Sequence, residues 1–387
     1  MTAFLVFWIS AALLAYTYGG YHLLLRAAAC CMPGRRSARD GTQRVDARDA
    51  PTVAVIVAVY NEERVIARRL ENLLALDYPR DRLQIVVASD GSTDRTVEIA
   101  RRYASSGVAA LALPRRGKAL AQNDAVAGAH VDIIVFTDAD SEFDRRFLRA
   151  VVARFREDDR VGCVVGNLAW RGNETATGAL RTWYWGLETD LRRVESQLGI
   201  LAGSTGAGMA VRREVWRPMG GPLDDSDSLT PLDVILQGGR VVFADDAIVH
   251  DVPFSSARSE FRAKVRGVSK SVTMILRRWG ARESLRHPVI TWRLVSHHFL
   301  RWLGPFVAVA FVISTVVLAP RGGIYLAAAW LEALVLGLGL LGYLGERSGR
   351  RVPVASVVYN FLAINAGMAI GFLAALFRAA KGPWETE

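Results

Sequence analysis

Four long and almost uncharged apolar runs lie at the two ends of this chain and constrain its fold most strongly. The first is Ala3–Leu25, and the other three are Phe299–Leu318, Ile324–Leu344 and Val354–Phe377. Each holds about twenty residues, enough for a helix to cross a hydrocarbon core of roughly 30 Å. A cleaved signal peptide is disfavoured for the first run, which lacks a basic start and continues too far. The pattern predicts an integral, multi-pass membrane protein.

Arginines in the connections between these runs predict the orientation of the chain. Residues 26–50 form a basic linker, and the joint Glu346–Arg351 carries three further arginines. Lys and Arg are enriched in cytoplasmic connections, so we expect both segments in the cytoplasm and both termini on the other side. The middle of the chain then lies in the cytoplasm, beside what we expect to be a bacterial inner membrane.

The stretch before the second apolar run allows two interpretations. Glu283–His298 mixes apolar side chains with Arg286, Arg293, His297 and His298. It is either an amphipathic helix along the membrane surface or a helix that closes the middle domain. The predicted organisation is a transmembrane helix at 1–25, a linker at 26–50, an α/β domain at 51–282, a possible interfacial helix at 283–298, three transmembrane helices at 299–377 and a short tail at 378–387.

The charge and cysteine content narrow the range of partners and compartments. The net charge is +10 and the pI is near 9.9. No cluster of Lys and Arg with interleaved aromatic residues is present, so we do not expect nucleic acid as a partner. An anionic membrane or a phosphorylated substrate fits the basic balance better. The cysteines Cys30, Cys31 and Cys163 have no metal-binding spacing and indicate a reducing compartment.

Short β-branched runs alternate with amphipathic stretches from residue 51 onward. The predicted strands are Thr52–Val59, Gln84–Ser89, Val108–Leu113 and Asp132–Thr137. Continuous apolar strands separated by helices indicate a parallel sheet that is covered on both faces. Ligands of such sheets bind beyond the carboxyl ends of the strands, where the polar residues described next are placed.

Asp138 and Asp140 follow the fourth predicted strand directly. In an extended chain, residues two apart point the same way, so both carboxylates can face one ion. Hard oxygen ligands suit Mg²⁺ or Mn²⁺, which completes its shell with phosphate oxygens of a substrate. An acidic turn at the end of a strand would look the same in isolation, and the strand-end placement beside other polar residues favours the metal site.

Asp90 and Lys118 occupy equivalent positions after two other strands. Asp90 could accept hydrogen bonds from a base or ribose, although Asp-Gly is also ordinary turn chemistry. Lys118 begins a helix, where a cation and the helix dipole together suit a diphosphate, although a solvated basic loop is equally compatible. The basic stretch Arg258–Lys270 is either a solvated helix face or a phosphate-binding arm beside the membrane.

A third acidic group lies further along the chain, at Asp224, Asp225 and Asp227. A carboxylate near the metal could take the proton from an acceptor hydroxyl. Spacing alone does not choose among the three, and a solvated surface cluster is the alternative.

Taken in order, these motifs resemble the inverting family 2 glycosyltransferases with a GT-A fold, in the membrane branch that includes polysaccharide synthases. Val57–Glu62 is similar to the opening strand and nucleotide loop, and Gly117–Asn123 to the Gly-Lys-Ala…Asn segment. Asp90 matches the uridine-binding aspartate, and Asp138-Ala139-Asp140 matches the Asp-x-Asp motif. The resemblance runs from about Val53 to Met274. It implies a mixed, mainly parallel Rossmann-like sheet and a nucleotide-sugar donor, with UDP favoured.

Further motifs extend the resemblance toward the acceptor side. Asp227–Leu232 aligns with the family's Asp-Asp-Phe-x-Leu-Pro-Leu-like pattern, which makes Asp227 the implied catalytic base and leaves Asp225 as a rival. The Gln-x-x-Arg-Trp motif of polysaccharide synthases is reduced here to Arg266. The resemblance implies nucleotide-sugar contacts at Tyr60, Asn61, Glu62, Asp90, Lys118, Asp138 and Arg266, and metal ligation by Asp138 and Asp140.

The resulting hypothesis is a metal-dependent membrane glycosyltransferase that moves a sugar from a nucleotide-sugar to a lipid-linked or glycan acceptor with inversion. The missing glutamine and tryptophan favour the addition of one or a few sugars. Two alternatives remain: a processive synthase that exports its polymer through its own helices, and a catalytically silent membrane scaffold for a synthase. A dehydrogenase is disfavoured because no Gly-x-Gly-x-x-Gly turn follows the first strand. The sequence names neither the sugar nor a protein partner.

Overall fold

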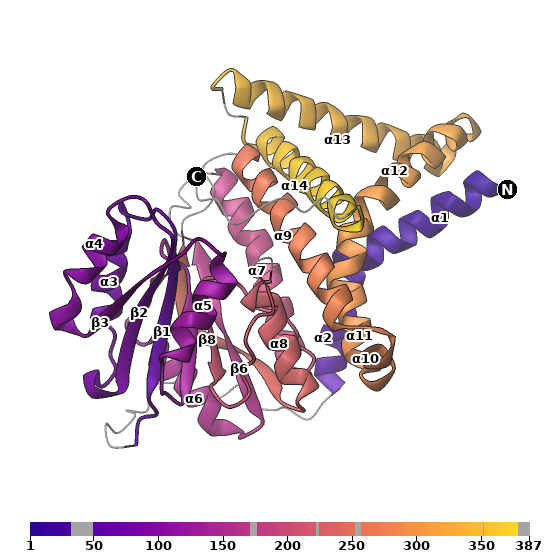
Figure 1. Ribbon diagram of the computed structural model, residues 1–387. Helices are drawn as coiled ribbons and strands as arrows, with labels where there is room; N and C mark the ends of the chain where they lie inside the picture. The colour runs from indigo at the N-terminus through magenta and orange to yellow at the C-terminus, as the bar shows by residue number, and fades with distance from the viewer. Residues whose placement is uncertain (32–48, 171–175, 222–223, 252–256, 351, 378–387) are drawn as a thin grey trace.

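The structure is a computed structural model that describes residues 1–31, 49–170, 176–221, 224–251, 257–350 and 352–377. Only the backbone is described for 176–184. Most of the predicted linker and the whole predicted tail lie outside the described residues. Figure 1 shows an α/β part that holds the sheet and a helical part that holds both ends of the described chain.

One mixed sheet forms the centre of the α/β part, with the strand order β3-β2-β1-β4-β7-β6-β8-β5. The first four strands in this order are parallel, whereas β7 is antiparallel to both of its neighbours. The GT-A prediction of a mixed, mainly parallel sheet is therefore confirmed. The strands are β1 Val53–Val59, β2 Leu83–Asp90, β3 Val108–Leu113, β4 Ile133–Thr137, β5 Glu142–Phe143, β6 Val161–Trp170, β7 Met209–Arg212 and β8 Arg240–Asp251.

Helices cover both faces of this sheet. On one face lie α3 (Ile66–Leu74), α4 (Thr96–Arg101) and α6 (Phe147–Glu157); on the other lie α5 (Lys118–Ala127), α8 (Ser226–Leu236) and α9 (Ala257–Arg278). The long helix α7 (Ala176–Gln197) follows β6. Short 3₁₀ turns lie at Arg80–Arg82 and Ala104–Ser106.

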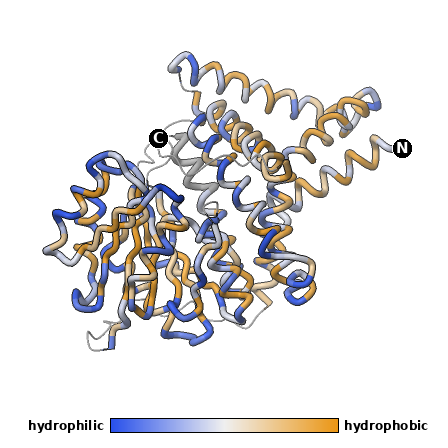
Figure 2. The backbone as a smooth tube through the Cα atoms, viewed as in Figure 1, coloured by the Kyte–Doolittle hydropathy of each residue, from blue (hydrophilic) through white to orange (hydrophobic). Residues whose placement is uncertain are grey.

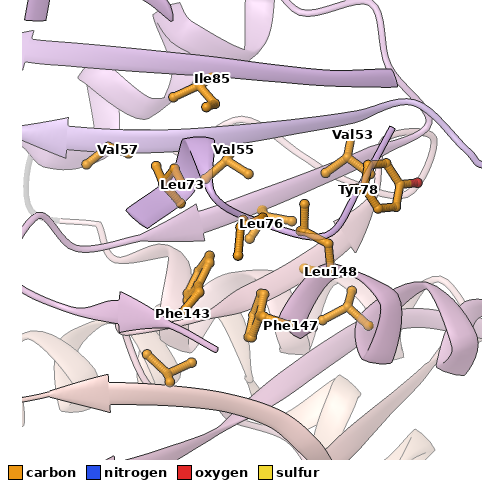
Figure 3. Packing of buried hydrophobic residues seen from close by; sticks show 14 of the residues in the cluster. Val53, Val55, Val57, Leu73, Leu76, Tyr78, Ile85, Phe143, Phe147 and Leu148 are labelled. Atoms are coloured by element: carbon orange, nitrogen blue, oxygen red, sulfur yellow. The ribbon is translucent and has the colours of Figure 1, made fainter. Parts of the chain in front are cut away.

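The alternation of side chains along β1 explains this double cover. Every residue of β1 is buried. Val53, Val55 and Val57 point into the core beneath α3 and α6, where the rings of Phe143 and Phe147 stack 3.8 Å apart (Figure 3). The alanine and isoleucine between them point into the second core. Successive residues of a strand face opposite sides, so a strand buried on both faces must be apolar throughout.

Within the described residues, four helices are long and apolar enough to cross a membrane, at Thr2–Cys31, Pro288–Arg321, Gly323–Arg347 and Pro353–Leu376. In Figure 2 most residues of these helices have the colour of hydrophobic residues, whereas the α/β part mixes hydrophobic and hydrophilic residues. The elements are α1 (Thr2–Ala15), a π-helical turn (Tyr16–Gly20), α2 (Tyr21–Cys31), α11 (Pro288–Leu294), a second π-helical turn (Val295–Phe299), α12 (Leu300–Leu318), a 3₁₀ turn (Ala319–Arg321), α13 (Gly323–Arg347) and α14 (Pro353–Leu376).

The second of these helices begins earlier than the sequence suggested. The predicted segment 283–298 is divided between the short helix α10 (Ala281–Arg286) and the start of α11, which continues through the π-helical turn into α12. Pro288 permits this start because proline is favoured in the first turn of a helix. Whether α10 lies on the membrane surface stays a prediction.

Helix α9 joins the α/β part to the membrane helices. It lies alongside α14, and Asn360 of α14 donates a hydrogen bond to Glu260 of α9 (2.9 Å). Two glycines of α14 allow this close approach. A methyl group at Gly371 would lie 2.7 Å from the carbonyl oxygen of Val265, and one at Gly367 would lie 3.0 Å from that of Phe261.

Candidate active site

Three of the predicted site residues lie at the carboxyl ends of adjacent parallel strands. Tyr60 follows β1, Asp90 ends β2 and Asp138 follows β4, and β1 is hydrogen-bonded to both of the other strands. Because parallel strands place their carboxyl ends along one edge, the structure brings these side chains to the same edge, where ligands of such sheets bind.

Asp90 is 1% exposed and holds the loop that precedes α5. Its carboxylate accepts hydrogen bonds from the backbone N–H of Arg116 (2.7 Å) and of Gly117 (2.9 Å). The guanidinium of Arg115 also lies 3.4 Å from it. Asp90 therefore fixes the loop 115–117, and any hydrogen bond to a base would add to these contacts.

Arg115 is a site residue that the sequence reasoning missed. Its guanidinium lies 3.2 Å from the centre of the Tyr60 ring, which is a close cation–π contact. Nothing in its local sequence separates it from neighbouring Arg116, whose side chain pairs with Asp124 instead. The Tyr60–Arg115 pair presents a flat, positively charged surface beside Asp90.

Asn61 and Glu62 form the turn after β1. Asn61 has a φ of 55°, a left-handed conformation that asparagine tolerates better than most residues. Its side-chain oxygen accepts a hydrogen bond from the N–H of Thr93 (2.8 Å), and its own N–H donates to Ser92 Oγ (3.1 Å). The amide group of Asn61 therefore joins two loops of the candidate site.

Lys118 lies next to Asp138 at the start of α5. Its ammonium group forms an ion pair with Asp138 Oδ1. Burial opposes the charged form, but the carboxylates of Asp138 and Asp227 outweigh it and raise the pKa of Lys118. The preceding Gly117 has a φ of 102°, which favours glycine and lets the chain turn into the helix.

A concentration of negative charge surrounds Asp138. Burial and the charges of Asp140 and Asp138 raise the pKa of Glu62 to about 7. Asp140 is exposed at the surface, yet crowding by surrounding protein and the charge of Asp138 raise its pKa. Beneath them, buried Arg69 donates to Thr137 Oγ1 (2.6 Å) and supplies one compensating charge, which the sequence reasoning also missed.

This arrangement fits a divalent cation that is shared with a substrate. Among the described residues, no group of three or more His, Cys, Asp or Glu side chains is arranged to hold a metal ion alone. Asp138 and Asp140 are the available pair. The raised pKa of Asp140 and Glu62 shows that carboxylates are crowded here, and a cation would relieve their repulsion. Mg²⁺ typically binds in this way, with few carboxylates and several substrate or water oxygens.

Asp227 approaches Asp138 from the opposite side of the site. A methyl group at Gly206 would lie 2.8 Å from Asp227 Oδ2 and 2.9 Å from Asp138 Oδ2, so both carboxylates border this glycine. The carbonyl of Asp227 accepts a hydrogen bond from the N–H of Ser204 (3.1 Å). Burial and neighbouring Asp225 raise the pKa of Asp227 well above its usual range.

Arg266 is exposed on α9, the helix that adjoins this acidic group. A lysine one turn further along α9, Lys270, senses the same charges: burial lowers its pKa, Asp225 opposes this, and Lys118 and Arg266 add to it. Arg266 and Lys270 lie on α9, which meets α8, the helix that carries Asp227, where Ser271 Oγ is 3.4 Å from Ser228 Oγ. Lys270 had not been singled out from the sequence.

Comparisons with known proteins show what the chain is similar to. Residues 54–218 match the glycosyl transferase family 2. The chain is 29% identical over 189 residues to the probable glycosyltransferase YdaM of Bacillus subtilis, covering 46% of this chain and 44% of that protein. It is 30% identical over 132 residues to the poly-beta-1,6-N-acetyl-D-glucosamine synthase of Staphylococcus aureus, covering 34% and 32%. The matches thus span less than half the length of these relatives.

One solved structure is similar over nearly the whole chain. It is the mannosyltransferase PcManGT from Pyrobaculum calidifontis, in complex with GDP-Man and Mn²⁺. The TM-score is 0.71 at 25% identity, and the match covers 96% of this chain and 99% of that one. The chain thus has the GT-A fold, with a region at residues 54–218 that matches glycosyl transferase family 2, and its described part includes four helices that are long and apolar enough to span a membrane.

Proposed function

We propose that the protein transfers a sugar from a nucleotide-sugar to a hydroxyl of a lipid-linked or glycan acceptor at the cytoplasmic face of a membrane. The observation that carries the proposal is the convergence of Asp138 and Asp227 on Gly206. The carboxylate of Asp138 comes from the strand ends where a nucleotide-sugar would bind. The carboxylate of Asp227 is free of ion pairs among the described residues. A sugar bound between them would have a base on the side opposite its diphosphate.

Asp227 is the proposed base. It would take the proton of the acceptor hydroxyl as that oxygen attacks the anomeric carbon, and the nucleoside diphosphate would leave from the other face, so the configuration inverts. Its raised pKa suits this role, because a base is most effective when its pKa lies near the working pH. Asp225, which faces it, is the rival candidate.

Positive groups would hold the donor. Lys118 lies beside Asp138, and Arg266 and Lys270 lie on α9, which contacts the helix of Asp227. Tyr60, Asn61 and Asp90 would place the nucleoside, for which we expect uridine; the GDP-Man complex of the archaeal mannosyltransferase makes guanosine the alternative. We propose that Asp138, Asp140 and the donor diphosphate share a Mg²⁺ or Mn²⁺ ion, which would neutralise charge on the leaving group. Glu62 would lie near this ion without binding it.

The experiment is nucleotide release by the full chain in lipid nanodiscs, with UDP-glucose, UDP-N-acetylglucosamine and GDP-mannose as separate donors and Mn²⁺ or Mg²⁺ present. Asp138→Ala and Asp140→Ala should each slow nucleotide release, because each variant loses roughly 3–4 kcal/mol of transition-state stabilisation. The matched control is Asp159→Ala, which removes a fully exposed carboxylate that faces Arg212 at the amino-terminal side of the sheet. Wild-type turnover by either site variant would disprove the assignment.

A processive synthase remains the second candidate because of the similarity to the staphylococcal synthase. Product sizing separates the two, since a single transfer gives one discrete product and a synthase gives a ladder. Absence of nucleotide release with every donor and both metals would favour the catalytically silent scaffold instead.

A further inference from the structure

The helix that carries the proposed base has a proline in its interior. Pro231 lies in the middle of the eleven residues of α8 and is buried. A proline at such a position has no N–H to donate to the carbonyl four residues earlier, and its ring pushes that carbonyl aside. The carbonyl concerned is that of Asp227. Because proline is the least favourable residue in the interior of a helix, its place opposite the base calls for a physical reason.

The carbonyl of Asp227 has a partner outside its own helix. It accepts a hydrogen bond from the backbone N–H of Ser204 (3.1 Å). Ser204 belongs to the loop 202–207, which lies shortly before β7. Backbone carbonyls are rarely left without a partner, and here the loop supplies the donor that Pro231 cannot supply.

The same loop also borders the side chain of Asp227. Gly206 follows two residues after Ser204, and a methyl group on it would lie 2.8 Å from Asp227 Oδ2 and 2.9 Å from Asp138 Oδ2. The loop therefore meets the proposed base twice, at its backbone carbonyl and at its carboxylate. A shift of the carbonyl would move the carboxylate of Asp227 relative to that of Asp138.

Two further hydrogen bonds hold the loop itself. The carbonyl of Ala207 accepts one from Thr137 Oγ1 (2.7 Å), and Thr137 directly precedes Asp138. The carbonyl of Ala202 accepts the other from Arg293 Nη1 (3.3 Å), which belongs to α11 at the start of a membrane helix. Thr137 and Arg293 are 1% and 2% exposed, so both attachments are buried. The loop is thus fixed to β4 and to a membrane helix, and α8 is aligned against it.

We propose that Pro231 is a positioning residue for Asp227. By withholding an N–H from the helix, it leaves the Asp227 carbonyl to the loop 202–207, and this bond sets where the carboxylate of the base lies relative to Asp138. The claim about catalysis rests on the proposed function, whereas the claim about the hydrogen bond does not. Through Arg293, the membrane helix takes part in holding the base.

The hydrogen bond is tested by hydrogen exchange of the full chain in lipid nanodiscs, which needs no activity. Pro231→Ala restores an N–H and should draw the Asp227 carbonyl back into the helix. Exchange of the Ser204 amide, localised by fragmentation mass spectrometry, should become about two- to tenfold faster, the scale of one lost hydrogen bond. The matched control is Pro305→Ala, which replaces an interior proline of α12 and should leave that amide unchanged. Unchanged exchange in Pro231→Ala would overturn the proposal.

Nucleotide release separates positioning from a structural effect. Pro231→Ala should lower kcat about tenfold or more, because misplacement of a reacting group by about 1 Å can cost about 10²-fold in rate. KM for the donor should change little, since Asp90 and Lys118 lie on β2 and α5. The melting temperature should not fall, because alanine is favoured over proline inside a helix. A loss of activity that accompanies a lower melting temperature, or an unchanged kcat, would contradict the role.

A rescue variant isolates the missing N–H as the cause. The ester analogue of alanine at position 231 is as small as alanine but, like proline, has no N–H. It should keep the slow exchange of the Ser204 amide and recover most of the wild-type kcat. Equal losses in the alanine and ester variants would show that the N–H is not responsible, and the proposal would fall.

Failure of the proposed function gives a different result. If the wild-type chain releases no nucleotide with any donor, the proposed function fails and the claim about catalysis fails with it. Exchange of the Ser204 amide would still decide whether Pro231 controls the hydrogen bond to Asp227.

Discussion

Lys118 and Asp138 form an ion pair that joins the start of α5 to the carboxyl end of β4. Each has a proposed role in donor binding. Lys118 would contact the donor diphosphate, and Asp138 would help to hold the divalent ion. Their pairing holds the long lysine side chain and the aspartate carboxylate in place before any substrate arrives. Such preorganisation lowers the entropy that must be lost when the donor binds.

Replacing Lys118 by alanine should lower kcat/KM for the donor by about 10²–10³-fold, as for removal of one well-placed electrostatic group. Lys118→Arg should retain part of the activity because the charge is kept. The matched control is Arg116→Ala in the same loop, whose exposed side chain pairs with Asp124. Steady-state kinetics with varied donor provide the measurement, and equal losses in the two alanine variants would contradict the role.

The pH dependence should distinguish Asp227 from Asp225. A base must be ionised, and burial together with the charge of Asp225 raises the pKa of Asp227, so activity should increase with pH through a value above the usual aspartate range. Asp225→Asn removes the repelling charge and should move this rise to lower pH, with activity retained. Asp227→Asn should abolish transfer but preserve donor binding. The reverse pattern of activities would identify Asp225 as the base.

The parallel half of the sheet was predictable because its strands are buried on both faces. The predicted strand Val108–Leu113 has the observed bounds, and the other three agree within one residue at each end; β2 extends one residue further than predicted and so includes Asp90. The strand-end positions of Asp90 and Asp138 follow from that pattern. The antiparallel strand β7 was not predicted, because it is short and follows a glycine-rich loop that has no periodicity.

Long-range pairings were also beyond the sequence. Arg69, Arg115 and Lys270 belong to the site because of where their helices and loops pack, and their local sequences resemble those of other surface cations. The same holds for Arg293 and Glu195, which pair across 98 residues of chain. Hydrophobic periodicity predicts which face of a helix is buried. It does not identify which charged side chain of the helix meets a partner.

Glu62 should make the stability of the metal-free protein depend on pH. Its pKa is raised from 4.5 to about 7, mainly by burial and then by Asp140 and Asp138. The folded state therefore binds the proton more tightly than the unfolded state, and the contribution to stability is complete below about pH 4.5 and lost as the pH rises through about 7. Glu62→Gln should reduce the fall in melting temperature between pH 5 and pH 8. An identical fall in both proteins would contradict the assignment.

The pair formed by Glu195 and Arg293 should stabilise the attachment of α11 to the α/β part. Arg293 donates to Glu195 Oε2 from Nη2 (2.8 Å) and Nε (3.0 Å), and the two side chains are 0% and 2% exposed. Arg293→Met leaves a buried carboxylate with fewer partners and should cost about 3–5 kcal/mol of stability. The matched control is Arg286→Met, at an exposed position of α10. Denaturation in nanodiscs provides the measurement, and equal stability of the two variants would show that the pair contributes little.

Gly206 provides a test of the site that changes no charged group. A methyl group there would approach the carboxylates of both Asp138 and Asp227 to less than 3 Å, a distance that carbon atoms do not tolerate, so one carboxylate must move. Because misplacement of a reacting group by about 1 Å can cost about 10²-fold in rate, Gly206→Ala should lose activity on that scale while its melting temperature stays close to wild type. The control lies in the same loop: a methyl group at Gly203 would meet its nearest atom, His298 Nε2, at 3.6 Å, which is an ordinary contact. Gly203→Ala should therefore remain active. If the two variants are equally active, Asp138 and Asp227 do not act together on one substrate; if Gly206→Ala alone fails, the site requires the space between them.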